Sequence, residues 1–598
     1  MTTDEIAAQT KLTRLTENLA RVEALSARLM QAIAVRKPHD AALDGPSQEV
    51  FMKAATAYVT GMMQNPAKMM EQQVSYWGKT LRNYVEAQQA VVKGEAAVEP
   101  VATPVKDRRF ANPLWDTNPA FNYLKQQYLL NVESVQTALS DMETLDADDR
   151  KRVEFFTRQI VDMFAPTNFL GTNPDALEKA MATDGESLVQ GLENLVRDVE
   201  ANRGNLAVTL SDQEAFKVGG NIATTPGSVI FRNRLFELIQ YTPTTETVFK
   251  TPLLIFPPWI NKFYVLDLKP ANSLIRWIVE QGFTLFVVSW VNPDASYADT
   301  TMDDYIRDGF LTAMAETRRV TGEKQINAVG YCIAGTTLAL TLAHLHKAGD
   351  ASVKAATFFT TLTDFSDSGE VGVFLANDFV DGIERQSKAD GILSKAFMSR
   401  TFSYLRSNDL IYQPAIKSYM LGETPPAFDL LFWNGDGTNL PATMAVEYLR
   451  GLCQDDGFAQ GMFKVFGRNV KLSDVQLPLC AVACETDHIA HWKGSFNGVR
   501  QMGSPDKTFI LAQSGHIAGI INPPSKGKYG HYSNAGPMAA PEDWRESATF
   551  TPASWWPRWR DWLAEKSGPQ MPARVPGDGP LAVLCPAPGT YVTAVPGL

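Results

Sequence analysis

One cysteine stands between an apolar, β-rich run and a helical tract. The run Ile326–Gly330 leads into Tyr331 and Cys332, and the helix-forming residues 336–347 come next. This order of strand, tight turn and helix exposes a nucleophile at the head of a helix, where the dipole and the free N–H groups favour a thiolate. Such a thiolate attacks carbonyl carbon, and the N–H of Ile333 is placed to face the developing oxyanion. The sequence therefore predicts nucleophilic acyl chemistry at Cys332.

Two further motifs supply the acid and the base that this nucleophile needs. Asp487 follows the strand-like run Leu479–Ala483, and His516 follows the run Thr508–Ala512 on a loop that contains glycine. The chain order nucleophile, acid, histidine is that of the α/β-hydrolase fold, in which chemistry gathers at the carboxyl ends of strands. The chain has only seven histidines, so the position of His516 is informative. We predict a triad of Cys332, His516 and Asp487.

Other interpretations of these residues compete with catalysis. A free cysteine is often a small buried hydrophobe. Asp487, His488 and His491 have a spacing that a metal site could use, but no further ligand pattern supports one, and we expect no metal. The elbow also departs from its usual pattern, because Ala334 stands where glycine is common, although Gly335 follows at once. Alanine there predicts some strain or a shifted helix.

The elements that must position these residues form an α/β region from about residue 215. Short β-rich runs alternate there with helical tracts, which is typical of a mostly parallel sheet covered by helices. The predicted strands are Val229–Gln240, Pro252–Phe256, Thr284–Ser289, Ile326–Gly330, Ala355–Thr360, Leu479–Ala483 and Thr508–Ala512. The gap between the fifth and sixth of these is too long for an ordinary crossover. We interpret about 365–445 as an inserted cap over the catalytic face.

The residues before this region are mostly helical in pattern. Residues 1–92 hold an apolar stripe (Leu12, Leu15, Leu19, Val22, Leu29 and Ile33) and a second helical tract over about Gln48–Val92. Residues 93–106 lack periodicity and are typical of a linker, helical sequence resumes over 107–214, and the catalytic domain covers 215–598. The apolar stripes either pack on each other or on the main body, or form a docking surface for a partner or an apolar particle.

The composition is that of an ordinary globular protein. Apolar residues make up 45% and charged residues 20%, and the net charge is 55 − 66 = −11, without a basic stripe, so we expect no nucleic-acid partner. The five cysteines are irregularly spaced, which disfavours a disulfide framework and favours a reducing, cytoplasmic compartment. We expect neither a signal peptide nor a transmembrane segment, because no apolar run approaches a spanning length of about 18 residues.

Long stretches between about 110 and 560 match one known family. They are Pro257–Tyr264, Leu266–Leu268, Val288–Trp290, Asn292–Ser296, Asn408–Leu410, Pro425–Asp429, Trp433–Asn434, Thr438–Pro441, Glu485–Ile489, Gly515–Gly519 and Asn522–Pro524. In these stretches the chain resembles the class I polyhydroxyalkanoate synthases. The family usually has glycine at position 334 and proline at position 491, so Ala334 and His491 are departures that bear on the elbow and on the loop of Asp487.

The resemblance implies an acyltransferase that polymerises (R)-3-hydroxyacyl-CoA, typically 3-hydroxybutyryl-CoA, into a polyester and releases CoA, with no separate cofactor. It also implies a homodimer at the surface of a cytoplasmic storage granule, where other granule-associated proteins are further partners. For the substrate site we predict contacts from Trp259, Asn261 and Asp267, with the N–H of Ile260 as a second oxyanion donor. Two alternatives stay open: a cysteine-type thioesterase of the same fold, and a non-catalytic granule-coat protein.

Overall fold

The computed structural model describes residues 3–36, 40, 43, 48–64, 66–93, 107–140, 145–536 and 538–595. The chain divides into two compact units, which consist of Met1–Leu210 with Phe402–Pro426 and of Ser211–Thr401 with Ala427–Leu598. The linker predicted at 93–106 lies outside the described residues apart from Lys93. Part of the predicted cap, 402–426, belongs to the first unit.

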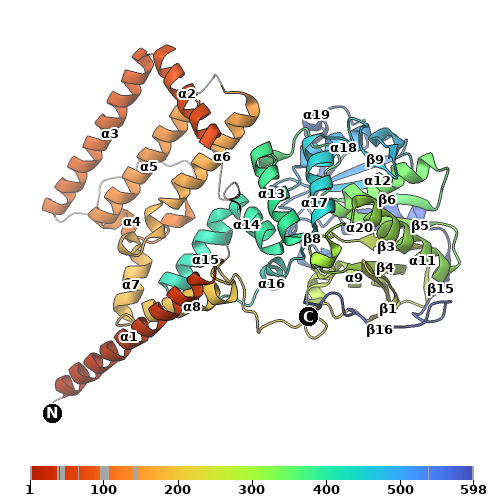
Figure 1. The fold of residues 1–598 in the computed structure, drawn as a ribbon, viewed down its shortest axis with the longest axis horizontal. Coiled ribbons are helices and arrows are strands. Elements are labelled where there is room, and N and C mark those ends of the chain that lie inside the picture. The colour runs from red at the N-terminus through yellow and green to blue at the C-terminus, as the bar shows by residue number, and fades with distance from the viewer. Residues whose placement is uncertain are drawn as a thin grey trace. The chain divides into compact units, whose positions relative to one another are not determined.

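The first unit is built of helices (Figure 1). They are α1 (Thr3–Ala34), α2 (Gln48–Gln64), α3 (Pro66–Lys93), α4 (Leu114–Thr117), α5 (Pro119–Ser140), α6 (Ala147–Met163), α7 (Pro174–Ala182), α8 (Glu186–Ala201), the end of α14 (Lys395–Leu405), and α15 (Gln413–Ala415). The helical tract predicted over about Gln48–Val92 consists of two helices, α2 and α3. Pro66 begins α3, because proline lacks an N–H and suits the first position of a helix.

The apolar stripe predicted for α1 is only partly buried. Leu25 packs in a cluster with Val189 and Val196 of α8. Leu19 is 61% exposed and Ile33 is 44% exposed. The helix therefore uses the middle of its stripe for packing within the unit.

The segment 402–426 fits closely onto α8. A Cβ on Gly191 would lie 2.0 Å from the carbonyl oxygen of Tyr419, so only glycine allows this approach. Asn194 donates from Nδ2 to the carbonyl of Ser418 at 3.0 Å, and the Tyr419 hydroxyl donates to buried Asp198 at 2.8 Å. Residues more than 200 positions apart thus form one packed body.

The second unit is organised around one mixed sheet. Its strands are β1 (Gly227–Arg232), β2 (Phe236–Tyr241), β3 (Thr247–Phe256), β4 (Phe283–Trp290), β5 (Ile326–Tyr331), β6 (Val353–Phe359), β11 (Leu479–Cys484), β12 (Lys507–Ala512), β13 (His531–Ser533), β14 (Thr549–Thr551), β15 (Gln570–Pro572) and β16 (Cys585–Pro586). The order is β14-β13-β12-β11-β6-β5-β3-β4-β2-β1-β16, and β15 pairs with β3. The middle of the sheet, from β4 to β12, is parallel.

The predicted strands match this parallel centre, with one exception at the edge. The run predicted as a single strand over Val229–Gln240 is the antiparallel hairpin β1–β2. Asn233 makes the turn, because its side-chain oxygen accepts hydrogen bonds from the N–H groups of Leu235 and Phe236. A turn built on one asparagine was not recognisable inside an otherwise β-rich run.

Helices of the crossovers pack on the sheet and position its carboxyl edge (Figure 1). The helices of this unit outside the cap are α9 (Leu274–Glu280), α10 (Met302–Asp304), α11 (Thr312–Thr321), α12 (Ile333–Lys347), α18 (Trp492–Gln501), α19 (Pro541–Glu546) and α20 (Trp556–Lys566). The α/β-hydrolase architecture predicted from the sequence is therefore present, with a helical N-terminal region before it. No helix in the described ranges combines the length and apolarity needed to cross a bilayer.

Smaller elements lie between β6 and β11 in the chain. They are α13 (Asn377–Asp390), β7 (Ile392–Leu393), α16 (Asp429–Gly435), β8 (Leu440–Pro441), α17 (Ala442–Glu447), β9 (Lys464–Val465) and β10 (Arg468–Asn469). A π-helical turn, Tyr448–Gln454, continues α17. The part of the predicted cap that remains in this unit thus consists of short helices around the two-stranded β7–β8 ribbon.

Candidate active site

Cys332 occupies a strained turn between β5 and α12. Its backbone has φ 54° and ψ −125°, a conformation that is costly for a residue with a Cβ and that persists only where the surroundings hold it. The Cys332 N–H donates to the carbonyl of Phe359 at 2.8 Å, and the N–H of Gly335 donates to the carbonyl of Cys332 at 2.8 Å. The residue Cys332 is partly exposed. This is the geometry of a nucleophile elbow.

The close approach in this elbow is made by Gly335 and not by residue 334. A Cβ on Gly330 would lie 2.6 Å from the Cα of Gly335, and a Cβ on Gly335 would lie 2.0 Å from Oγ1 of Thr361. Ala334, the neighbouring residue, is fully buried. The elbow therefore tolerates alanine in place of glycine at position 334, because the residue that must lack a side chain is the adjacent Gly335.

Asp487 and His516 meet as the sequence predicts. Nδ1 of His516 donates to Oδ2 of Asp487 at 2.7 Å, and both side chains are almost completely buried. The other oxygen, Oδ1, accepts hydrogen bonds from the N–H groups of Ile489 and Ala490 at 2.8 and 2.9 Å. Because both oxygens are occupied, the carboxylate has a fixed orientation and fixes the tautomer of the imidazole.

The electrostatics of this group favour a charged imidazole. Burial opposes a charge on His516, but the charges and hydrogen bonds of Asp487 and of the Cys332 sulfur outweigh it and raise the pKa of His516 well above its usual range. Since Nδ1 is taken by Asp487, Nε2 is the nitrogen left for the sulfur. The arrangement can hold an imidazolium beside a thiolate, which is the chemistry of an activated cysteine nucleophile.

Two tryptophans that the sequence analysis did not single out hold the histidine loop. Trp555 donates from Nε1 to the carbonyl of Gly519 at 2.8 Å, and Trp556 donates to the carbonyl of Ile520 at 2.9 Å. A Cβ on Gly519 would lie 2.4 Å from Sγ of Cys484, so β11 also presses against this loop. The only sign of these contacts in the sequence is the adjacent pair of tryptophans. The sequence does not show which group accepts a hydrogen bond from each indole N–H.

The predicted second oxyanion donor lies on a loop that the cap fixes in place. The carbonyl of Ile260 accepts a hydrogen bond from the N–H of Thr438 at 3.1 Å, and the Thr438 hydroxyl donates to the carbonyl of Trp259 at 3.0 Å. Asn261 forms an isolated bridge with Gly437. The roles of Ile260 and Ile333 as donors stay predictions, although Ile333 as the first residue of α12 has no intrahelical acceptor for its N–H.

The three predicted substrate contacts have different surroundings. Trp259 is buried and donates from Nε1 to the Thr337 hydroxyl of α12 at 3.1 Å. Asp267 is 2% exposed and accepts hydrogen bonds from Thr225 and from Ser273. This bonding supports a structural role for Asp267, and burial raises the pKa of its carboxyl group against those hydrogen bonds. Asn261 is partly exposed. Contact of these residues with substrate stays a prediction.

Two residues of the metal alternative, Asp487 and His491, are engaged with other groups. The Asp487 carboxylate is occupied by His516 and by backbone N–H groups. His491, which precedes α18, places Nδ1 3.0 Å from Oδ2 of Asp367 in the loop after β6. His491, which stands where the family usually has proline, therefore joins the loop of Asp487 to the beginning of the predicted cap through this pair of side chains.

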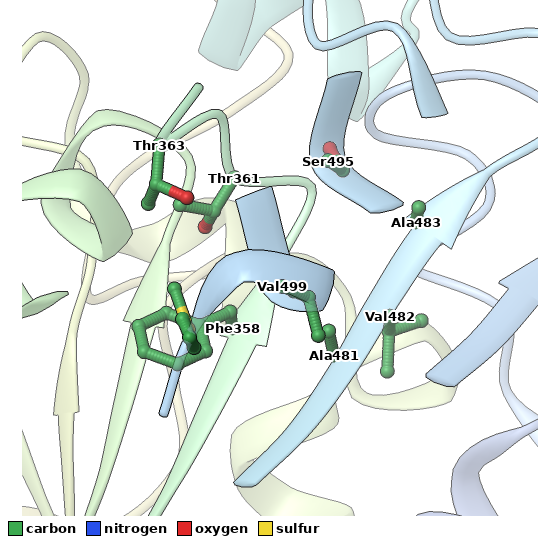
Figure 2. Close-up of a pocket in the computed structure, with 9 residues that line it drawn as sticks. Phe358, Thr361, Thr363, Ala481, Val482, Ala483, Ser495 and Val499 are labelled. Atoms are coloured by element: carbon green, nitrogen blue, oxygen red, sulfur yellow. The ribbon is translucent and has the colours of Figure 1, made fainter. Parts of the chain in front are cut away.

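A small cavity lies between β6, β11 and α18 (Figure 2). Its lining is Phe358, Thr361, Thr363, Ala481, Val482, Ala483, Ser495, Val499 and Met502. The volume is about 10 Å³, which is about the room that one water molecule needs. The buried hydroxyl of Ser495 has no hydrogen-bond partner among the described residues. This cavity contains no triad residue and is too small for a substrate.

The chain matches two family models. Residues 106–278 match the poly-beta-hydroxybutyrate polymerase (PhaC) N-terminus, and residues 249–523 match the alpha/beta hydrolase fold. The chain is 41% identical to a poly(3-hydroxyalkanoate) polymerase of Methylorubrum extorquens, over 92% of this chain and 91% of that one. This chain belongs to the poly(3-hydroxyalkanoate) polymerase family.

Further members of this acyltransferase family have a similar sequence identity to this chain. The polymerase subunit of Rhizobium meliloti is 40% identical, over 86% of this chain and 83% of its own, and that of Cupriavidus necator is 38% identical, over 90% of each. Among solved structures, a soluble variant of monoglyceride lipase from Saccharomyces cerevisiae matches with a TM-score of 0.35 and 11% identity, over 59% of this chain and 99% of that one. The fold assignment rests on the family model and the sheet order and not on this distant likeness.

Proposed function

We propose that this chain polymerises (R)-3-hydroxyacyl-CoA, with 3-hydroxybutyryl-CoA as the expected substrate, through a thioester formed on Cys332. One observation carries the proposal. The hydrogen bond of 2.7 Å between His516 and Asp487 lies beside the strained nucleophile elbow, in a member of a polymerase family. The names of the relatives give the class of reaction, and this geometry supports a mechanism that passes through a thioester on Cys332.

In the first step His516 accepts the proton of Cys332 and the thiolate attacks the thioester carbonyl. The bond from carbonyl carbon to the CoA sulfur breaks, and the CoA thiolate takes the proton from the imidazolium. The oxyanion would be stabilised by the N–H of Ile333 and, as a second donor, by that of Ile260. One thioester replaces another at nearly equal energy, so the acyl group stays activated on the enzyme.

In the second step the 3-hydroxyl of one acyl unit attacks a neighbouring thioester. His516, held by Asp487, removes the hydroxyl proton, an ester bond forms and the carbon–sulfur bond breaks. The released thiolate regains a proton, and repetition lengthens the polyester. Water competes with the hydroxyl, so the site must be covered during this step.

The cap offers a cover that is attached near the oxyanion loop. Trp433 of α16 donates from Nε1 to the carbonyl of Lys262 at 2.7 Å, and Asp436 pairs with Lys262 at 2.7 Å. Tyr264 also donates to Asp436, at 2.9 Å. We infer that residues 427–441 are the fixed base of the cover in the catalytic unit.

The deciding experiment follows the acyl group of 3-hydroxybutyryl-CoA. The proposal expects insoluble polyester together with free CoA from the parent protein, and neither from Cys332→Ala. Soluble hydroxy acid released in step with CoA would support the thioesterase alternative instead. Unchanged polymer formation by purified Cys332→Ala protein would eliminate Cys332 as the nucleophile. Release of neither polyester nor CoA by the parent protein would favour the coat-protein alternative.

We also propose that the chain acts as a homodimer at the polyester surface. The support is the outer face of α3, where Met70, Val74, Trp77 and Leu81 are 68, 67, 65 and 63% exposed. Their spacing of four, three and four residues places them on one side of the helix. An apolar polymer is the surface on which such side chains lose contact with water.

A further inference from the structure

Tyr331, the residue immediately before the nucleophile, contacts the catalytic histidine directly. Its hydroxyl donates to the backbone carbonyl of His516 at 3.3 Å, and both groups are buried. Its ring lies 6.0 Å from the imidazole, centre to centre, with 33° between the planes. The last residue of β5 therefore contacts the loop that follows β12, across two intervening strands.

Tyr331 is itself held firmly. It is fully buried, and it is in register with Phe359 of β6, whose ring packs edge-on against it at 6.2 Å. Phe359 in turn packs against Trp555 and Trp559 at 5.2 and 5.5 Å. Because the phenol belongs to this packed aromatic column, it is a fixed point against which a loop can be positioned.

The histidine loop is anchored at three carbonyl groups. Trp555 and Trp556 hold the carbonyls of Gly519 and Ile520, and Tyr331 holds the carbonyl of His516 itself. Of these anchors, Tyr331 is the one bonded to the residue that carries the imidazole. Burial raises the pKa of the Tyr331 phenol, so the group remains a proton donor at neutral pH.

We propose that Tyr331 is a positioning residue for His516. Its hydroxyl fixes the His516 backbone and its ring limits the tilt of the imidazole, so that Nε2 faces Cys332 while Nδ1 stays on Asp487. This inference rests on the proposed function, because it concerns the same triad. It adds the Tyr331 side chain to the proposed site, and neither the triad motifs nor their order in the chain indicates this residue.

The test replaces Tyr331 by phenylalanine, which keeps the ring and removes only the hydroxyl. The matched control is Tyr591→Phe, since the Tyr591 hydroxyl also donates to a backbone carbonyl, that of Asn233 at 2.7 Å, in the C-terminal segment. Three quantities are measured on full-length protein: the rate of CoA release from 3-hydroxybutyryl-CoA, the rate of Cys332 alkylation by iodoacetamide from pH 5.5 to 9, and the unfolding temperature.

We expect Tyr331→Phe to lower kcat by roughly three- to tenfold with little change in KM, the loss typical of one neutral hydrogen bond. The ratio of alkylation rates at pH 6 and pH 9 should also fall, because a displaced imidazolium stabilises the thiolate less well at low pH. Tyr591→Phe should leave both quantities at the parent values. Tyr331→Leu, which also removes the ring, should exceed Tyr331→Phe in both effects.

Two results would overturn the inference. One is a Tyr331→Phe protein with the parent's kcat and the parent's alkylation profile. The other is a lower unfolding temperature and lower activity with an unchanged alkylation profile, which is what a merely structural tyrosine would give. Alkylation does not require polymer, so these results are distinct from a failure of the proposed function, which the Cys332→Ala protein reveals.

Discussion

The core of the catalytic unit and helix α3 of the helical unit use their apolar side chains in opposite ways. In the catalytic unit Tyr331, Phe359 and Trp555 are fully buried in one continuous core that also supports the triad. In the helical unit α3 buries Ala90 but leaves Trp77 65% exposed. These aromatic side chains are therefore enclosed in the core of the catalytic unit, whereas α3 presents an apolar face that packing within its unit does not explain.

The polar contacts of Asp487 and of α1 differ in the same direction. Asp487 has a side chain with no exposure and uses both oxygens. In the helical unit Arg28 of α1 pairs with Glu200 of α8, and both side chains are substantially exposed, at 55 and 39%. Exposed pairs contribute little to stability, because water and salt screen the two charges. Substitutions in the catalytic unit should thus alter chemistry and stability, and those on α3 should alter association.

The largest expected effect is that of Asp487→Asn on elongation. The amide retains the shape of the carboxylate but cannot stabilise an imidazolium or hold the same tautomer, so elongation should fall by about 100-fold or more. Acylation of Cys332 should survive, because a thiolate needs less help from the base than a hydroxyl does. Mass spectrometry of the acyl-enzyme and the polymer yield measure the two steps separately.

Equal losses in acylation and elongation would contradict this division of labour. Asp367→Asn is the matched control, since Asp367 pairs with a histidine, His491, that is outside the triad. We expect this control to retain both steps.

The next effect concerns the steric requirement of the elbow. Gly335→Ala places a Cβ 2.0 Å from Oγ1 of Thr361 and should cost about 1–3 kcal/mol of unfolding free energy, with reduced activity. Ala334→Gly restores the usual family residue and should change activity by less than about twofold, because no close contact depends on it. Denaturant unfolding and CoA release measure both variants. A harmless Gly335→Ala would show that the helix can shift.

On the helical unit, Trp77→Glu/Leu81→Glu should abolish most binding to polyester particles. Both positions are exposed, so unfolding free energy should change by less than about 0.5 kcal/mol. Sedimentation with poly(3-hydroxybutyrate) particles measures binding, and analytical ultracentrifugation measures the oligomer.

The control for this pair is Ser75→Glu/Gln89→Glu, which adds the same charge to exposed positions of α3 outside the stripe. It should bind like the parent. Equal binding of both double variants would exclude the stripe as the polymer contact, and a loss of dimer alone would assign it to self-association.

The smallest expected effect is on the pH dependence of stability. The pKa of His516 is raised in the folded state, so its contribution is complete below the unfolded value of about 6.5 and is lost as pH rises through the folded pKa. The parent should therefore lose more stability between pH 6 and pH 9 than His516→Gln. Urea midpoints at the two pH values measure the difference, and parallel curves would refute it.

The sequence predicted the parallel centre of the sheet and the meeting of His516 with Asp487. These are local signals, since each predicted catalytic residue lies in the short turn or loop after a strand and the fold fixes where parallel strands end. The hairpin β1–β2 was missed, because its one asparagine lay within an otherwise uniform run, and the sequence analysis did not divide the helical tract at Pro66. Asp267 was predicted to contact the substrate, but its carboxyl group accepts hydrogen bonds from Thr225 and Ser273.

By itself, the sequence determined the α/β-hydrolase architecture and predicted the kind of nucleophile and the order of the triad, because these depend on short patterns of residue type. Only the tertiary structure decided that Gly335 and not residue 334 makes the close contact, that 402–426 packs on α8, and that Tyr331 reaches His516. Those relations join residues that no local pattern connects, and they depend on how side chains fill the space between elements.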